Sequence, residues 1–264
     1  MSKIEKIPEL VERVDKLRET DHPYEDSAKE LAKKEDKFRG KLEKYRERLK
    51  KKGFDDQELK EYIEELADDF SNESLKAIEN KKEGMIDKLT GVGNRQFIEA
   101  MIPKFLSFEK RENHNCSIIM VDIDHFKDIN DEHGHFEGDK VLKDIVDVMG
   151  RTIRGSDFVI RYGGEEFAIF CPDTNLAGAQ EVSERIRAAV EEEGVRGRTI
   201  SLGCMSTSEI PEWKSQTEGE INFQDIKNEL LAKADQALYC SKDNGRNQVT
   251  LYRPDLPPRK KSQN

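Results

Sequence analysis

Apolar residues in the first 84 positions recur at helical spacing on narrow stripes. The pattern predicts a short amphipathic helix over residues 8–18, a second helix over about 25–52, and a third after the capping sequence Gly53-Phe54-Asp55-Asp56. The apolar positions of the second helix are Leu31, Phe38, Leu42, Tyr45 and Leu49. Because the stripes are narrow and the other faces polar, these helices need a partner, either one another or a second copy of the chain.

The third helix is predicted to continue to Met85, with its second apolar seam offset from its first. Such an offset changes the winding of a coiled coil, which is typical of a dimerising helix that transmits a signal. The same pattern also fits a plain helical hairpin that covers the core.

From about residue 85 the pattern changes to alternating helices and strands. Helices are predicted over residues 94–111, 125–133, 138–154, 175–193 and 223–242. Strands are predicted over 116–122, 199–205 and 248–252, with a hairpin over 157–170. This order indicates an α/β (α+β) domain, with a mixed sheet covered by helices. The tail from Arg253, with three prolines and Arg-Lys-Lys, is predicted to be disordered.

Charge supports the same division. Residues 1–84 hold 45 charged side chains, whereas the remaining 180 hold 55. We therefore expect an N-terminal helical regulatory or dimerisation module over 1–84, a second domain over 85–252 and a tail over 253–264.

The net charge of −10 disfavours nucleic acid and anionic membranes as partners, because both are usually bound by a basic surface. The chain has no apolar run of transmembrane length and no secretory leader, so we expect a cytoplasmic protein. The four cysteines are widely spaced without a Cys-x-x-Cys pair, which argues against a zinc ribbon or a redox dithiol.

Two glycines and two carboxylates, Gly163-Gly164-Glu165-Glu166, precede an apolar run that is typical of a buried strand. Adjacent glycines allow a tight turn and let an anionic ligand approach the backbone. The segment therefore resembles a site of metal-assisted phosphate chemistry. An ordinary Gly-Gly hairpin with two solvated glutamates fits the same residues.

A second group of carboxylates ends the predicted strand Cys116 to Asp122. Asp122 and Asp124 share a face because side chains alternate along a strand, and the carbonyl of Ile123 is a further hard oxygen ligand for Mg²⁺. If this strand lies beside the glycine hairpin, Asp122 and one of the two glutamates converge on the same metal.

Five sequence blocks together resemble the GGDEF-domain diguanylate cyclases over about residues 85–252. They are Asp-Lys-Leu-Thr-Gly-Val-Gly-Asn-Arg (87–95), Val-Asp-Ile-Asp-His-Phe-Lys-Asp-Ile-Asn (121–130), Gly-His-Phe-Glu-Gly-Asp (134–139), Arg-Tyr-Gly-Gly-Glu-Glu-Phe (161–167) and Lys-Asp-Asn-Gly-Arg-Asn (242–247). Their order matches the family, which is far more specific than any single block.

The resemblance implies a palm-like fold with a mixed, mainly antiparallel central sheet. It also implies a reaction in which two GTP condense to cyclic di-GMP and two pyrophosphates, catalysed by a homodimer. Two Mg²⁺ ions, or Mn²⁺ in their place, would neutralise phosphate charge in each active site.

The resemblance also assigns roles to individual residues. Asp122, the Ile123 carbonyl and Glu165 would hold metal, and Glu165 would accept the proton. Glu166 receives a supporting metal role, because adjacent strand residues face opposite ways. Lys127 would stabilise charge on the phosphates in the transition state.

The implied substrate-binding residues comprise a triphosphate clamp, amides at a helix N-terminus, guanine readers and two glycines that leave room for the phosphates. They are, in that order, Lys242 and Arg246, His125 and Phe126, Asn130 and Asp139, and Gly163 and Gly164. Without the resemblance, Lys127 and Lys242 are ordinary surface charges.

Upstream of the glycines, Arg154-Gly-Ser-Asp157 matches the Arg-x-x-Asp site at which this family binds its own product, and Arg185 matches a secondary contact in some members. The resemblance therefore implies product feedback inhibition. An ion pair at the start of a strand is the other explanation of Arg154 and Asp157.

Two other functions compete with the enzyme: a degenerate, non-catalytic cyclic di-GMP receptor and a mainly structural coiled-coil protein. The intact candidate catalytic residues argue against the receptor, and the second domain is unexplained by the structural protein. His125, His133 and His135 fit no common zinc spacing. The N-terminal region offers only His22 as a soft ligand, which disfavours a haem or zinc sensor there.

Overall fold

The computed structural model describes residues 85–214 and 221–258, together with positions 40, 42–44, 46, 47, 50, 51 and 57. The chain divides into two units, Met1–Gly91 and Val92–Asn264. Positions 40, 42–44, 46, 47 and 50 are helical. The helix expected over residues 8–18 and most of the two that follow it lie outside the described residues, so the N-terminal module and its dimerising helix stay predictions.

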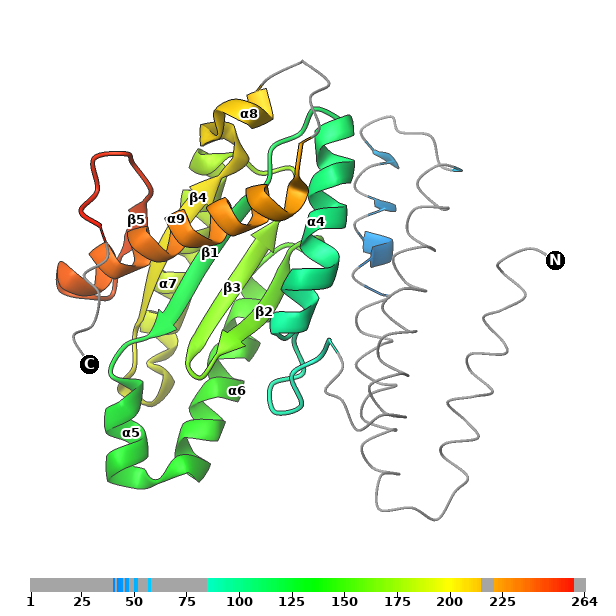
Figure 1. The fold of residues 1–264 in the computed structure, drawn as a ribbon. Coiled ribbons are helices and arrows are strands. Elements are labelled where there is room, and N and C mark those ends of the chain that lie inside the picture. The colour runs from blue at the N-terminus through cyan, green and yellow to red at the C-terminus, as the bar shows by residue number, and fades with distance from the viewer. Residues whose placement is uncertain are drawn as a thin grey trace, which may run out of the picture. The chain divides into compact units, whose positions relative to one another are not determined.

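The second unit is a five-stranded sheet with helices packed against it (Figure 1). The strands are β1 (Ser117–Ile123), β2 (Phe158–Gly163), β3 (Glu166–Cys171), β4 (Ile200–Ser206) and β5 (Val249–Leu251). The helices are α4 (Arg95–Arg111), α5 (Phe126–His133), α6 (His135–Thr152), α7 (Leu176–Glu193), α8 (Pro211–Lys214) and α9 (Phe223–Asp243), with the 3₁₀ turns η2 (Val195–Gly197) and η3 (Thr207–Glu209).

The strand order is β2-β3-β1-β4-β5. All neighbouring strands are antiparallel except β4 and β5, which are parallel. This arrangement confirms the expectation of a mixed, mainly antiparallel sheet. β1 is the central strand and all seven of its residues are buried, including Ser117 and Asp122 at either side of the apolar run Ile118-Ile119-Met120-Val121.

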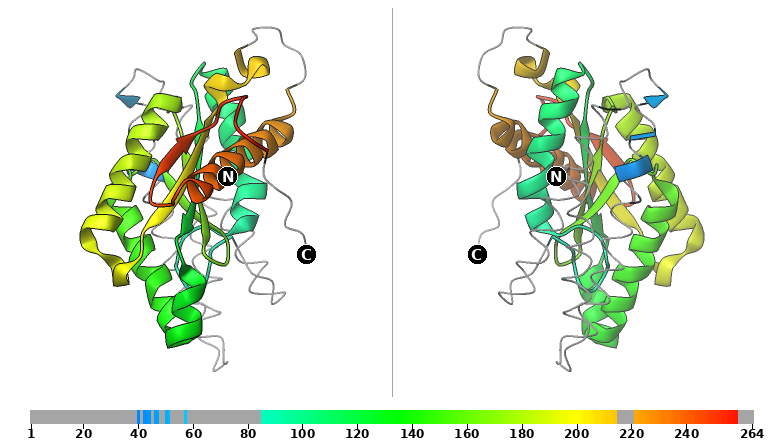
Figure 2. Two further views of the ribbon diagram at one scale, coloured as in Figure 1. Left: turned by 90° about the vertical axis from the view of Figure 1, so that its left-hand side faces the viewer. Right: turned by 90° about the vertical axis from the view of Figure 1, so that its right-hand side faces the viewer.

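Helices cover both faces of the sheet. In the side views of Figure 2, α4 and α9 lie on one face and α6 and α7 on the other. Phenylalanine rings from α4, β2 and β3 pack together in the core, with Phe105 5.0 Å from Phe158 and 5.6 Å from Phe170 between ring centroids. The rim of this packed sheet is a rigid support for the residues at its strand ends.

Gly203 of β4 allows α9 to lie directly on the sheet. A Cβ at this position would stand 2.1 Å from the backbone nitrogen of Leu238 and 2.2 Å from the carbonyl oxygen of Ala234. Both atoms belong to helix backbone, which cannot move aside as a flexible side chain does. The close approach fixes the position of α9 and hence of Lys242 in its last turn.

Most element boundaries agree with the sequence pattern to within two residues, but α6 begins at His135 and not at Gly138. Gly138 lies inside the helix, where a Cβ would stand 2.1 Å from Asn130 Oδ1. The glycine therefore permits close packing of α5 on α6 and does not mark a helix end.

The tail differs from the expectation of disorder over part of its length. The backbone N–H of Leu256 donates to the Arg253 carbonyl and closes a turn, and Gln236 Nε2 of α9 donates to the carbonyls of Leu256 at 2.9 Å and Pro257 at 3.1 Å. The residues that make these contacts are far apart in the sequence, and the composition of the tail did not predict the hydrogen bonds between them. Residues 259–264 lie outside the described residues.

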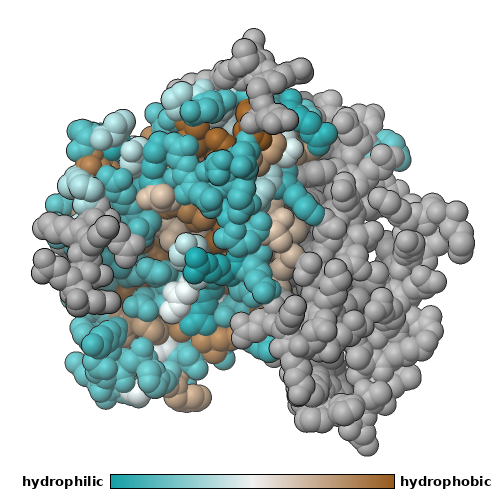
Figure 3. Space-filling model, in the orientation of Figure 1, coloured by the Kyte–Doolittle hydropathy of each residue, from teal (hydrophilic) through white to brown (hydrophobic). Residues whose placement is uncertain are grey.

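The described surface in the view of Figure 3 is mainly hydrophilic, and its hydrophobic residues gather in small separate patches. Phe136, at 74% exposure, is the large hydrophobic residue most open to solvent in the described part of the chain. Within that part, none of the helices has the length and apolar character required to cross a bilayer.

Candidate active site

The candidate carboxylates meet at one edge of the sheet. Asp122, near the end of β1, pairs across the ladder with Glu166 of β3 on one side and with Ser201 of β4 on the other. Because directly opposed residues of an antiparallel pair share a face, the side chains of Asp122 and Glu166 lie on the same side of the sheet. Sequence reasoning placed Glu166 in a supporting role, and the register makes it the cross-strand neighbour of Asp122.

Glu165 lies in the turn between β2 and β3. Gly163 pairs with Glu166, which leaves Gly164 and Glu165 as a two-residue connection, and Gly164 has a φ of +52°. This left-handed conformation is easily adopted only by glycine. Arg161 Nε donates to the Gly164 carbonyl at 2.9 Å and braces the turn.

Asp122 is the electrostatic centre of this edge. Its side chain is buried, and this burial is the main reason that the pKa of the carboxyl rises from 3.8 to about 6. The hydrogen bond and charge of Lys242 lower that pKa, whereas the charges of Glu165 and Glu166 raise it further. The Asp122 carboxyl with the negative charges of Glu165 and Glu166 nearby forms a place where positive charge is favoured.

Lys242 supplies one such charge, because its Nζ lies 2.6 Å from Asp122 Oδ2. Among the described residues, no group of three or more His, Cys, Asp or Glu side chains stands ready to hold a metal ion. The donor chemistry nevertheless fits Mg²⁺, since carboxylate and carbonyl oxygens are its preferred protein ligands. A cation bound to Asp122 would share or displace the Lys242 contact.

Asp124 does not take part in this group. Its carboxylate accepts hydrogen bonds from the hydroxyls of Thr199 and Ser201 and from the backbone of Asn247. Sequence reasoning grouped Asp124 with Asp122 and missed these three partners, which lie 75 to 123 positions away. The only available signal was the presence of Asn247 in the last quoted sequence block.

The predicted guanine-reading residues lie on facing helices. Asn130 of α5 has its side chain against the backbone of Gly138 in α6, and Asp139 follows Gly138. Lys127 is exposed in the first turn of α5. His125 is the N-cap residue, with a left-handed φ of +55° and no capping hydrogen bond from its side chain. Its Nδ1 lies 3.4 Å from Asp128 Oδ2.

The loop after α9 carries Arg246. It has three consecutive left-handed residues, Gly245, Arg246 and Asn247, with φ values of +110°, +64° and +44°. The Arg246 side chain is exposed, and Lys242 lies one turn earlier, at the end of the helix. Through its contact with Asp122, Lys242 joins the end of α9 to the end of β1.

A family model described as "Diguanylate cyclase, GGDEF domain" matches residues 84–248, which is more than half of the chain. The chain belongs to the GGDEF family of diguanylate cyclases. This result confirms the resemblance found in the five sequence blocks.

Named relatives agree with this family. Diguanylate cyclase A of Treponema denticola is 40% identical over 157 residues, which are 57% of this chain and 38% of the relative. Diguanylate cyclase DgcP of Pseudomonas aeruginosa is 33% identical over 175 residues, 66% of this chain and 25% of the relative. The matched part therefore spans well under half of each of these two proteins.

The fold also resembles a solved structure of the coiled coil and GGDEF domain of DgcB from Caulobacter crescentus in complex with c-di-GMP. The TM-score is 0.54 and the identity 28%, and the match covers 68% of this chain and 91% of the chain in that structure.

The Arg-x-x-Asp block of this GGDEF domain forms the tight turn before β2. Asp157 is fully buried, and its Oδ2 accepts from the backbone N–H of Arg154 at 2.9 Å, whereas the Arg154 side chain is exposed. Arg185 Nε of α7 donates at 3.0 Å to the carbonyl of Thr152, the last residue of α6, which lies two positions before Arg154. The Asp157 carboxylate thus has a structural role, whatever else it does.

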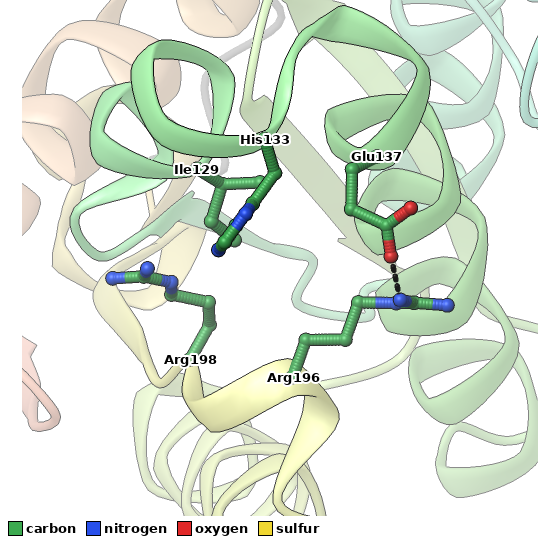
Figure 4. A pocket seen from close by; sticks show the side chains of 5 residues that line it. All are labelled: Ile129, His133, Glu137, Arg196 and Arg198. Carbon is green, nitrogen blue, oxygen red and sulfur yellow. Dashed lines mark hydrogen bonds and ion pairs between the residues drawn. The ribbon is translucent and has the colours of Figure 1, made fainter.

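A cavity of about 350 Å³ borders α5 and the start of α6 (Figure 4). Its lining residues are Ile129, His133, Glu137, Arg196 and Arg198. Arg196 forms ion pairs with Glu137 and, at 3.1 Å, with Asp144, so its charge is already compensated by carboxylates. We interpret this arginine as a link between η2 and the α6 helix that carries Asp139.

Proposed function

We propose that this protein is a diguanylate cyclase that condenses two GTP into cyclic di-GMP with release of two pyrophosphates. The observation that carries the proposal is the placement of Asp122, Glu165 and Glu166 at one sheet edge, with Lys242 in contact with Asp122. The named relatives are diguanylate cyclases, which supports the same reaction.

In the proposed reaction the 3′-hydroxyl oxygen of one GTP attacks the α-phosphorus of the other. The new phosphorus–oxygen bond forms as the bond to the β-phosphate oxygen breaks, and pyrophosphate leaves. Glu165 takes the proton from the hydroxyl, and the second bond forms in the same way with the two nucleotides exchanging roles. The position of Glu165 in a glycine turn at the sheet rim supports this assignment.

The metal site is proposed on Asp122, the Ile123 carbonyl and Glu165, with Glu166 in support. When bound, Mg²⁺ neutralises the triphosphate and lowers the pKa of the attacking hydroxyl. Lys242 and Arg246 bind the triphosphate, and Lys127 stabilises charge that develops on the phosphates. Gly163 and Gly164 leave room beside the turn for those phosphates.

We further propose that Asn130 and Asp139 read the guanine edge, because an amide and a carboxylate match its acceptors and N–H donors. The amides at His125 and Phe126 add donors at the start of α5. Each domain holds one GTP, so turnover needs two subunits facing each other, and the helices of residues 1–84 are proposed to control that arrangement in a cytoplasmic homodimer.

Product inhibition is proposed at Arg154, Asp157 and Arg185. The exposed position of Arg154, and the contact of Arg185 with the end of α6 two residues before it, support a site for a guanine and a phosphate. The buried position of Asp157 means that ligand binding there would act on the turn that it stabilises.

The test is incubation of the purified full chain with GTP and Mg²⁺, with chromatographic detection of cyclic di-GMP. We expect product from the wild type and from Glu192→Gln, which removes an exposed carboxylate of α7, but none from Glu165→Gln. Light scattering on the same samples records whether each variant forms dimers.

A dimeric, metal-loaded wild type that forms no product would contradict the proposal. If that sample still bound cyclic di-GMP, the non-catalytic receptor would be the correct function. Activity retained in Glu165→Gln would contradict the role of Glu165 alone.

A further inference from the structure

Asp124, the first residue after β1, holds a buried carboxylate with three hydrogen-bond donors. It is 2% exposed. Its Oδ1 accepts from Ser201 Oγ at 2.7 Å, and its Oδ2 accepts from Thr199 Oγ1 at 2.7 Å and from the backbone N–H of Asn247 at 3.0 Å. The backbone N–H of Asp124 donates to the Thr199 carbonyl at 2.9 Å. These contacts join the end of β1, the start of β4 and the loop after α9.

That loop is held in an unfavourable conformation. Arg246 and Asn247 are non-glycine residues with left-handed φ, which costs each of them about 1 kcal/mol and persists only where contacts impose it. Two hydrogen bonds from backbone N–H groups impose this conformation. Arg246 N–H donates to the Ser241 carbonyl at 3.0 Å, and Asn247 N–H donates to the side chain of Asp124.

The Asn247 side chain anchors the same loop to α7. Its Nδ2 donates to Glu191 Oε1 at 2.8 Å, and its Oδ1 accepts from Arg187 at 3.1 Å. These two contacts involve a half-buried side chain at the surface, whereas the bond to Asp124 is made in a buried site two residues from Asp122. Asp124 is therefore the direct link between the loop and the strand that bears the proposed metal ligand.

From this geometry we infer that Asp124 is a positioning residue, which holds the loop of residues 244–247 against the end of β1. The proposed triphosphate-binding residue Arg246 and the proposed metal ligands thereby keep a fixed position relative to one another. The inference rests on the proposed function for the role of Arg246. It assigns Asp124 neither to the metal nor to the substrate, because its oxygens are already occupied by Thr199, Ser201 and Asn247.

Two substitutions separate positioning from general support. In Asp124→Asn the side-chain oxygen can still accept from Thr199 and Asn247. The side-chain NH₂ group then faces Ser201, whose hydroxyl can accept a hydrogen bond as well as donate one. Asp124→Ala removes all acceptors and leaves the Asn247 N–H unpaired. Glu109→Ala is the matched control, because Glu109 is also a buried carboxylate and lies before the start of β1. Its Oε2 is 3.1 Å from His114 Nδ1.

Hydrogen exchange of the full-length protein tests the anchoring without any nucleotide. In Asp124→Ala we expect residues 244–247 to exchange at least about tenfold faster, with β3 unchanged, and in Asp124→Asn we expect a change below about threefold. Unchanged exchange of this loop in Asp124→Ala, or equal acceleration of loop and β3, would overturn the inference.

A double-mutant cycle tests the consequence for binding. The probe is guanosine 5′-[(α,β)-methyleno]triphosphate with Mg²⁺, measured by titration calorimetry. Arg246→Ala should weaken binding about 30-fold in the wild type and in Glu109→Ala, but less than about threefold in Asp124→Ala. Asn130→Ala, on the guanine side, should weaken binding equally in all backgrounds.

An equal loss from Arg246→Ala in every background would show that Asp124 does not position Arg246, and would overturn the inference. A wild type that binds no analogue and forms no cyclic di-GMP would instead remove the proposed function. In that case hydrogen exchange still decides whether Asp124 anchors the loop.

Discussion

Replacement of Asp122 by Asn should stabilise the metal-free protein at neutral pH. The buried carboxyl has its pKa raised from 3.8 to about 6, so between these pH values the folded chain keeps a proton that the unfolded chain has lost. The unfolding free energy therefore falls as the pH rises through this range, by about 3 kcal/mol at completion. Asn has the shape of the protonated acid and never ionises, so the variant escapes this loss.

Trp213 provides the assay, because it is the single tryptophan of the chain and is buried in the second unit. Urea unfolding followed by its fluorescence, in EDTA, gives the free energy of unfolding at each pH. We expect the advantage of Asp122→Asn over wild type to grow by about 2 kcal/mol between pH 4.5 and pH 8. Asp147→Asn, at an exposed position of α6, controls for the loss of one negative charge.

A stability difference between Asp122→Asn and wild type that does not change with pH would refute the electrostatic reasoning. The same titration in MgCl₂ tests the proposed metal site without any activity measurement. Ligands that bind only the folded state raise its unfolding free energy, so Mg²⁺ should stabilise the wild type and leave Asp122→Asn unchanged.

Four further substitutions test the packing and the proposed regulation. Gly203→Ala should destabilise the second unit by about 3 kcal/mol or more in urea unfolding, since its Cβ would meet the α9 backbone; a loss below about 1 kcal/mol would contradict the close approach. Glu99→Gln removes the carboxylate paired with Lys227, which is 1% exposed, and should lower the free energy of unfolding by about 2 kcal/mol in the same assay. Lys227→Met should lower it less, because no buried charge then remains unpaired. Arg154→Ala should let cyclic di-GMP accumulate beyond the level at which the wild type stalls, and stalling at the same level would argue against the Arg154 site.

Sequence patterns predicted the local features of this domain well. The apolar residues before Asp122 predicted the strand β1, and the glycine pair predicted the tight turn that joins β2 to β3. Asn94 and Asn175, at the starts of predicted helices, cap α4 and α7 through their side chains. Each of these features depends on residues within a few positions of one another.

Features that depend on distant residues were predicted less completely: the convergence of Asp122 with one glutamate was expected only if β1 lay beside the glycine hairpin. Strand register places Glu166 opposite Asp122, and no single strand encodes its own register. Asp124 carries the same side chain as Asp122, yet its role follows from Thr199, Ser201 and Asn247, which only the fold brings to it. Gly138 marked a helix start in the sequence pattern, but packing against Asn130 explains it.

The stoichiometry of the reaction tests the central claim most directly. Purified wild-type dimer is mixed with GTP and Mg²⁺, and pyrophosphate and cyclic di-GMP are quantified in the same samples, with Glu165→Gln in parallel. We predict two pyrophosphates for each cyclic di-GMP in the wild type and neither product in the variant. Release of pyrophosphate without cyclic di-GMP, or no turnover of GTP by the dimer, would contradict the account.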